Sequence, residues 1–298
     1  MNGALRSLLV GLCLLAAASA ARAEVAVVDD SGATVRLAAP ARRIVSLAPD
    51  LTETLFAAGA AGRVVGTVEY SDYPEEARAI ARVGSYSRID LERVVALRPD
   101  LIVAWQRGNP AAHLERLRAA GIPLYLSQTS RIEDIASSLE RLGVLAGSET
   151  QARSAAATFR RRLVQLQTRY SDRPPVRTFY QIWKQPLMTV GRSQIISDVI
   201  RLCGGENVFA QIEALAAVVS VEAVVAANPE AIVASGMDES RPEWLDDWRR
   251  WPAVQAVARS NLFFVPPDLI QRHTPRLLEG AELFCEHLEK ARSRRPSR

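Results

Sequence analysis

Residues 90–105 read DLERVVALRPDLIVAW, and residues 220–235 read SVEAVVAANPEAIVAS. Aligned without gaps, these two stretches are identical at eight of their sixteen positions. Each copy predicts a short helix that begins after a capping residue, Asp90 or Ser220, followed by a proline that ends the helix and by a buried apolar strand. We therefore predict that the chain contains two similar halves.

Residues 148–170 separate the two copies and predict one long helix. They contain no Gly or Pro and are rich in Ala, Arg, Gln and Leu, and Ser148 with Gln151 predicts a capping box at their start. Such a helix is roughly 33 Å long. Strand and helix patterns alternate on both sides of it, which indicates parallel sheets covered by helices. The predicted fold class is α/β, with two Rossmann-like lobes joined by a single backbone helix and a ligand cleft between them.

The first residues predict a cleavable secretory signal peptide over 1–23. Arg6 is followed by an apolar run too short to span a membrane, and small residues close the segment at Ala23. The mature protein is then expected in the periplasm. The remaining boundaries are an N-terminal lobe over 24–147, an interlobe helix over 148–171, a C-terminal lobe over 172–291 and a basic, frayed tail over 292–298.

Two cysteines remain once the predicted signal peptide, which holds Cys13, has been removed. An even pair in an oxidising compartment favours a disulfide, so we predict one between Cys203 and Cys285. Two buried free thiols are the alternative. A metal site is not expected, because two cysteines alone are too few ligands and no others cluster near them in the sequence.

Composition and motifs exclude several classes of function. The formal net charge is only +4, and 33 carboxylates are interspersed with the basic residues, which is not typical of nucleic-acid binding. No nucleophile, phosphate-loop or metal-protease motif is present. We expect His113 and His287 to be solvated on helices, whereas His273 lies in a loop and could face a ligand. An exported α/β enzyme remains an alternative to a binding protein without a cofactor.

Aromatic and sulfur-containing side chains follow several of the predicted strands. Tyr70, Tyr86 and Trp105 do so in the first half, and Trp183 and Met188 in the second. Ligands of open α/β sheets bind outside the carboxyl ends of the strands. Flat rings with a polar edge suit a large flat ligand, although each ring could instead pack its own loop.

Glu92 and Glu222 occupy the same position in the two copies of the repeat. A carboxylate in the first turn of a helix is favoured by the helix dipole, which is sufficient to explain each residue. A matched pair on two lobes is also what a two-fold symmetric partner with two basic pockets would bind. The spacing alone does not separate these explanations.

Three segments resemble a known family: EYSDYPEEA (69–77), DLERVVALRPDLIVAWQRGN (90–109) and LCGGENVF (202–209). They are similar to the periplasmic vitamin B12-binding proteins of cobalamin ABC importers, which are substrate-binding proteins with a helical backbone. The similarity extends from about residue 43 to residue 289. It implies a monomeric carrier that captures cobalamin or another corrinoid and delivers it to a dimeric membrane permease. A carrier of siderophores or haem with the same fold is the alternative.

The resemblance also implies roles for individual residues. Glu92 and Glu222 match glutamates that dock on the permease, and Cys203 with Cys285 matches the family disulfide. Tyr86 and Met188 depart from the family pattern, which has Trp and Phe there, and so does Ala216, where a Trp is usual. Taken together, the strand ends and the resemblance predict these ligand contacts: Tyr70, Tyr86, Trp105, Trp183, Met188, Asp268, Leu269, Ile270, Gln271 and Arg272.

Overall fold

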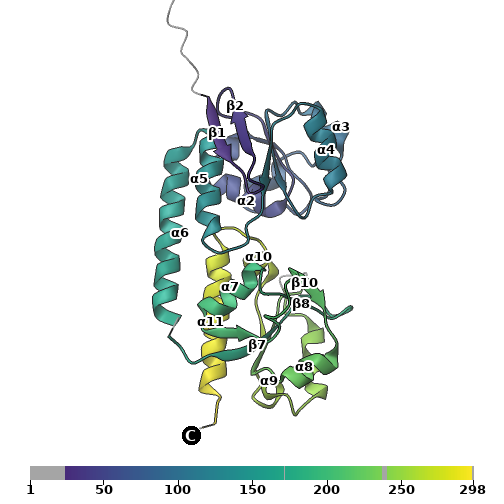
Figure 1. Cartoon of the computed structure of the whole chain (residues 1–298), viewed down its shortest axis with the longest axis vertical. Coiled ribbons are helices and arrows are strands. Elements are labelled where there is room, and N and C mark those ends of the chain that lie inside the picture. The colour runs from purple at the N-terminus through teal and green to yellow at the C-terminus, as the bar shows by residue number, and fades with distance from the viewer. Residues whose placement is uncertain (1–23, 171, 237–239, 297–298) are drawn as a thin grey trace, which may run out of the picture.

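A computed structural model describes residues 24–170, 172–236 and 240–296. The predicted signal peptide over 1–23 lies outside these residues. Two α/β halves lie one above the other, and the helix α6 (Glu149–Tyr170) runs along one side of the molecule (Figure 1). Within the described ranges, no helix is long and apolar enough to cross a membrane.

The first half is built on a four-stranded parallel sheet with the order β4-β3-β5-β6. Its strands are β3 (Ile44–Ser46), β4 (Val64–Gly66), β5 (Leu101–Trp105) and β6 (Leu124–Ser127). Its helices are α2 (Pro49–Ala57), α3 (Leu91–Ala96), α4 (Ala111–Ala119) and α5 (Asp134–Ala146), with short 3-10 turns at Ala61–Arg63 and Glu75–Ala79. An antiparallel hairpin of β1 (Val25–Val28) and β2 (Thr34–Leu37) is added at the N-terminal end.

The second half repeats this plan with the order β12-β11-β7-β9, again all parallel. Its strands are β7 (Val176–Gln181), β9 (Gly205–Asn207), β11 (Ala231–Ala234) and β12 (Leu262–Phe264), with an antiparallel pair of β8 (Met188–Val190) and β10 (Ala216–Val218) beside them. Its helices are α7 (Ile195–Leu202), α8 (Val221–Ala227), α9 (Gln255–Ala258), α10 (Pro267–Ile270) and α11 (Leu277–Ser293), with a 3-10 segment at Glu243–Arg250.

The strand order confirms the prediction of two similar halves. In each sheet the first strand in the chain lies between the second and the third, and the fourth lies beyond the third. The sequence repeat falls on equivalent elements, α3 and β5 in one half and α8 and β11 in the other. Each first strand therefore meets its third at the point where the strand order reverses, which is where such sheets leave a crevice.

Helix α6 confirms the long helix predicted over 148–170. Its buried residues recur every three or four positions, which gives one apolar face, and they join a core cluster that also contains residues of both sheets. The predicted capping box is wrong. The Ser148 hydroxyl donates instead to the carbonyl oxygen of Ala58 at 2.7 Å, and the Gln151 side chain packs over Gly59.

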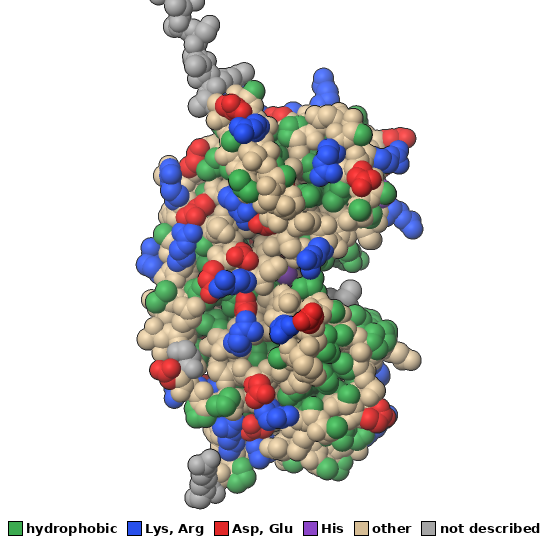
Figure 2. Space-filling view, viewed as in Figure 1, with side chains coloured by type: hydrophobic (Ala, Val, Ile, Leu, Met, Phe, Trp, Pro, Cys, Tyr) green, Lys and Arg blue, Asp and Glu red, His purple; other side chains and the backbone are tan. Residues whose placement is uncertain are grey.

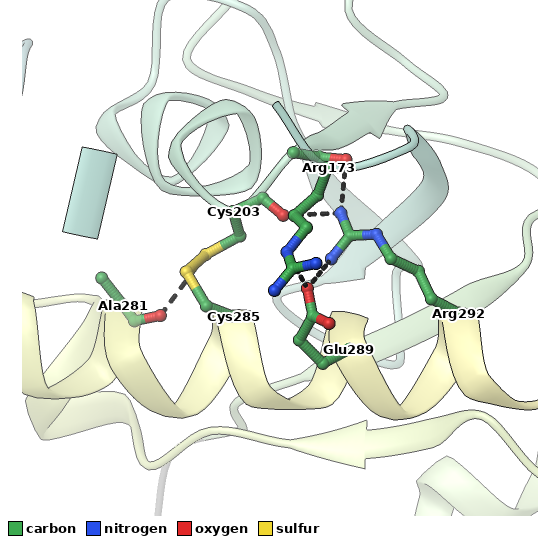
Figure 3. The surroundings of a disulfide bond; sticks show 7 residues. Arg173, Cys203, Ala281, Cys285, Glu289 and Arg292 are labelled. Atoms are coloured by element: carbon green, nitrogen blue, oxygen red, sulfur yellow. Dashed lines mark hydrogen bonds and ion pairs between the residues drawn. A yellow bond between two sulfur atoms is a disulfide. The ribbon is translucent and has the colours of Figure 1, made fainter. Parts of the chain in front are cut away.

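The predicted disulfide between Cys203 and Cys285 is present and joins the end of α7 to α11 (Figure 3). The two Cα atoms lie 4.6 Å apart, within the usual range for a disulfide. Arg292 reaches over the same junction and donates to the carbonyl oxygens of Cys203 and Gly204, both at 2.8 Å. The bridge therefore lies inside a set of polar contacts that close this end of the second half.

The expectation that residues 292–298 fray is wrong over most of that segment. Helix α11 continues to Ser293. Arg292 donates to the Pro174 carbonyl at 2.7 Å, and Arg295 forms an ion pair with Glu230 at 2.7 Å. The sequence predicts a solvated tail for these arginines, but they bind carbonyl and carboxylate oxygens of residues that are distant in the chain.

Candidate functional site

The carboxyl ends of both sheets face the gap between the two halves, and the first half places an aromatic pair there. Trp105 is the last residue of β5, and Tyr86 lies in the turn of residues 84–89. Their ring centroids are 6.0 Å apart with an angle of 49° between the planes. Tyr86 remains 42% exposed and Trp105 is half-buried, so the pair keeps part of its aromatic surface accessible.

Tyr70 is the most exposed of the predicted ligand contacts, with 71% of its surface accessible. Its backbone has φ 63°, a left-handed conformation that is unfavourable for an aromatic residue. Neighbouring contacts hold it there: Arg82 donates to the Ser71 carbonyl at 2.8 Å, and the Glu69 amide donates to the Gly84 carbonyl at 2.8 Å. The fold thus maintains an unfavourable backbone conformation that directs this ring into solvent.

The second half contributes Trp183, which follows β7, and Met188, the first residue of β8. The Ile182 amide donates to the Met188 carbonyl at 2.9 Å, and the Met188 amide donates to the Trp183 carbonyl at 3.2 Å. Trp183 is 38% exposed. The two side chains are therefore on the same small ribbon, at the carboxyl end of β7.

The segment 268–272 is only partly accessible. Ile270 is fully buried in the core, so we assign it to packing and correct its prediction as a ligand contact. Asp268, Leu269 and Gln271 are half-buried. The Gln271 amide donates to the Gly236 carbonyl at 3.2 Å and also to the hydroxyl of Ser235, and so it ties this segment to the end of β11.

A buried carboxylate, Glu53 on α2, connects the two halves at the base of the gap. It is 3% exposed and accepts hydrogen bonds from the Thr274 hydroxyl at 2.6 Å and from Arg276 Nε and Nη2, both at 2.8 Å. The Arg276 guanidinium lies 3.6 Å from the centre of the Tyr73 ring. Charge-assisted, two-pronged pairing of this kind is among the stronger polar contacts in proteins.

Arg272 belongs to the same interlobe cluster. It lies 2.7 Å from Asp72 of the first half and 3.1 Å from Asp268 of its own half. Partial burial opposes ionisation of Asp72, but the neighbouring guanidinium outweighs it and holds the pKa of Asp72 below its usual value. The charge of Arg272 is therefore compensated by protein carboxylates.

The histidines differ in part from expectation. His273 faces the Thr129 backbone, and burial lowers its pKa to about 4, so it is neutral at pH 7. The prediction that His287 is solvated is wrong, because its ring stacks on Phe263 at 4.7 Å and its Nε2 lies 2.9 Å from the Phe264 carbonyl. His113 is also half-buried. Within the described part of the chain, no cluster of three metal-ligating side chains is present.

Glu92 and Glu222 lie in the first turns of α3 and α8 and are exposed. The residues before them cap their helices in the same way: Asp90 accepts from the Arg93 amide at 3.0 Å, and Ser220 from the Ala223 amide at 3.1 Å. The nearby backbone amide and the Ser220 hydroxyl lower the pKa of Glu222. The two carboxylates therefore occupy equivalent positions in the first turns of two capped helices.

The surface is hollowed between the two halves, on the side away from α6 (Figure 2). A separate pocket of about 450 Å³ lies between α6 and the start of α11. It is lined partly by Ala155, Phe159 and Leu278, and it contains none of the predicted ligand contacts.

Two parallel sheets of equal order, one connecting helix and a hollow between them define a two-lobed binding protein. The sequence profile described as "Periplasmic binding protein" matches residues 44–269. The chain belongs to this family. Its members are binding proteins, which confirms the expectation that the chain is not an enzyme, and the family places it in the periplasm.

Curated relatives and solved structures agree with this assignment. The chain is 39% identical over 259 residues to the vitamin B12-binding protein of Vibrio parahaemolyticus, covering 86% of this chain and 92% of the relative. It is 38% identical to that of Yersinia pestis, covering 83% and 86%. The crystal structure of the periplasmic vitamin B12-binding protein BtuF of Vibrio cholerae superposes with a TM-score of 0.79 at 37% identity, covering 85% and 98%. A periplasmic haem-binding protein from Pseudomonas aeruginosa has a TM-score of 0.71 at 24% identity, covering 82% and 91%, and shares the fold.

The sequence reasoning missed three of the residues that join the halves: Glu53, Asp72 and Arg276. One signal was available, because Glu53 is an acidic residue in a mostly apolar stretch of the sequence, residues 51–58. Its partners lie more than 200 positions away, and nothing in the sequence pattern identifies them.

Asp50, on the same helix as Glu53, makes the stability of the folded protein depend on pH. Burial, together with the nearby carboxylate of Glu53, raises the pKa of Asp50 from 3.8 to about 6. The folded protein therefore holds this proton more tightly than the unfolded chain does. We predict that the contribution of Asp50 to the free energy of unfolding falls by about 2 kcal/mol as the pH rises from 4 to 6, and that Asp50→Asn removes this contribution. Urea unfolding across this range measures it, and parallel curves for the two proteins would contradict it.

Proposed function

We propose that the chain captures cobalamin or a related corrinoid between its two halves and delivers it to the permease of an ABC importer. The observation that carries the proposal is the set of accessible rings near the carboxyl ends of the sheets: Tyr70, Tyr86 and Trp183 are exposed, and Trp105 is half-buried. A corrinoid is a large flat ring with amide side chains, which suits stacking on such rings. The vitamin B12-binding relatives, similar over most of their length, support the same ligand.

A carrier of haem or of a siderophore is the second candidate. Anionic chelates favour free cationic side chains in the site. Arg272 does not offer one, because Asp72 and Asp268 already compensate its charge, whereas Arg107, two residues after Trp105, is exposed. The likeness to haem-binding proteins extends to the fold alone, and the balance of these observations favours a neutral, amide-edged ligand.

The proposal includes how the protein reaches its site of action. Residues 1–23 act as a leader cleaved after Ala23, and the mature chain works as a monomer. Its disulfide is consistent with an oxidising compartment.

The second half also contributes to the proposed site. Its contacts come from Asp268, Leu269, Gln271 and Met188, and no catalytic cofactor takes part.

Titration of the mature protein with cyanocobalamin tests the proposed ligand. We expect saturable 1:1 binding at or below micromolar concentration, seen by calorimetry and by quenching of tryptophan fluorescence. Trp105→Ala should weaken binding about tenfold or more, since it removes an aromatic contact, and Trp105→Phe should weaken it less. Haemin serves as the comparison ligand. Absence of cyanocobalamin binding, or tighter binding of haemin, would contradict the proposal.

We further propose that Glu92 and Glu222 dock the protein on the two halves of a permease dimer. Their matched positions and exposure support this role. Reversing both charges, with Glu92→Lys and Glu222→Lys, should abolish uptake of cyanocobalamin by cells while leaving affinity in solution unchanged. The control reverses two other exposed glutamates, Glu206 and Glu286, and should retain uptake. Equal uptake by both double variants would refute the docking role.

A further inference from the structure

Asn109 is a buried amide that links three segments at the edge of the aromatic pair. It is 5% exposed. Its Oδ1 accepts from the Trp105 amide at 2.7 Å, and its Nδ2 donates to the carbonyls of Leu47 at 2.9 Å and Tyr86 at 2.8 Å. Both amide hydrogens and the oxygen are therefore used, and each bond reaches a different segment.

The segments that Asn109 links carry the rings of the proposed site. Leu47 follows β3 and Trp105 ends β5, so the amide spans the place where the strand order reverses. Tyr86 lies at the tip of a turn that is closed by bonds between Ser85 and Arg88. That turn contacts the Trp105 segment through one polar bond, from Asn109 to the Tyr86 carbonyl.

The indole of Trp105 is fixed from its other side by Gly108. A Cβ atom at residue 108 would lie 1.7 Å from Cε3 of Trp105, so only glycine lets the ring lie against this backbone. Asn109 then closes the turn, because its own backbone amide donates to the Trp105 carbonyl at 3.0 Å. The ring orientation therefore depends on a close glycine contact and on one side-chain amide.

We propose that Asn109 is a positioning residue for ligand binding, which holds Tyr86 and Trp105 at the separation that a flat corrinoid face requires. It does not touch the ligand itself. A buried amide with all its hydrogen bonds satisfied is well suited to fix geometry, because each lost bond would leave an unpaired backbone group. The inference rests on the proposed function for its ligand, but the ordering of the two rings is a property of the free protein.

Asn109→Asp tests this role with almost no change of shape. The carboxylate still accepts from the Trp105 amide, but it places an oxygen against the carbonyls of Leu47 and Tyr86, so it breaks only the links between segments. We expect affinity for cyanocobalamin to fall about tenfold or more. The loss should be much smaller in a Tyr86→Ala background, where the ring to be positioned is already absent.

Asn261→Asp provides the matched control. Asn261 is fully buried and donates to the Glu230 carbonyl at 2.8 Å. It lies just before β12, at the amino end of that strand and in the other half of the protein. The control should lose thermal stability but keep wild-type affinity. An Asn109→Asp protein that is folded and binds as tightly as the wild type would overturn the inference.

A second readout is independent of the ligand. The near-ultraviolet circular dichroism contributed by Trp105 is obtained by subtracting the spectrum of the matching Trp105→Phe protein. Asn109→Asp should reduce this contribution, whereas Asn261→Asp should not. If the wild type fails to bind cyanocobalamin, the proposed function fails, and the difference spectra alone decide whether Asn109 orders the ring. An unchanged Trp105 signal would refute the ordering.

Discussion

The contact between Glu53 and Arg276 is the constraint on which the geometry of the site depends. The two residues come from different halves of the chain, and the carboxylate is almost completely excluded from water. A buried ion pair contributes little net stability over an apolar pair, but loss of one partner is strongly unfavourable because the other charge is left unpaired. Opening the halves here would expose or separate these charges, so the pair favours one separation. Helix α6 and the shared core enforce the same separation from the other side.

A fixed separation between the two halves means that the binding surfaces are in place before the ligand arrives. The rings of the first half are set by the Trp105 turn and by the strained backbone of Tyr70, and the Trp183 ring of the second half lies on the β7–β8 ribbon. When the surfaces are already in place, little conformational entropy is lost on binding. The charged residues nearby neutralise one another across the halves, which for the proposed ligand leaves stacking and hydrogen bonding as the main sources of affinity.

Local sequence patterns predicted much of the fold. The features that they missed depend on contacts between residues that are distant in the sequence. The repeat, the uninterrupted helix and the even pair of cysteines led to the two halves, α6 and the disulfide, because each rests on helix or strand periodicity or on the chemistry of the compartment. Ile270, His287 and the arginines of the tail were misjudged because their surroundings come from segments far away in sequence. The same reason hid Glu53 and Asn109, whose polar side chains look ordinary until the folded chain supplies their partners.

The separation of the halves in solution tests this account most directly. Ala96 and Ala226 are exposed at matched positions on α3 and α8, and Ala96→Cys with Ala226→Cys allows two spin labels while the native disulfide stays intact. Pulsed electron resonance should give one narrow distance distribution that shifts by no more than about 2 Å with saturating cyanocobalamin, and Glu53→Gln should broaden it. A broad distribution in the unmodified background, or a large closure on binding, would contradict a gap held at nearly constant width.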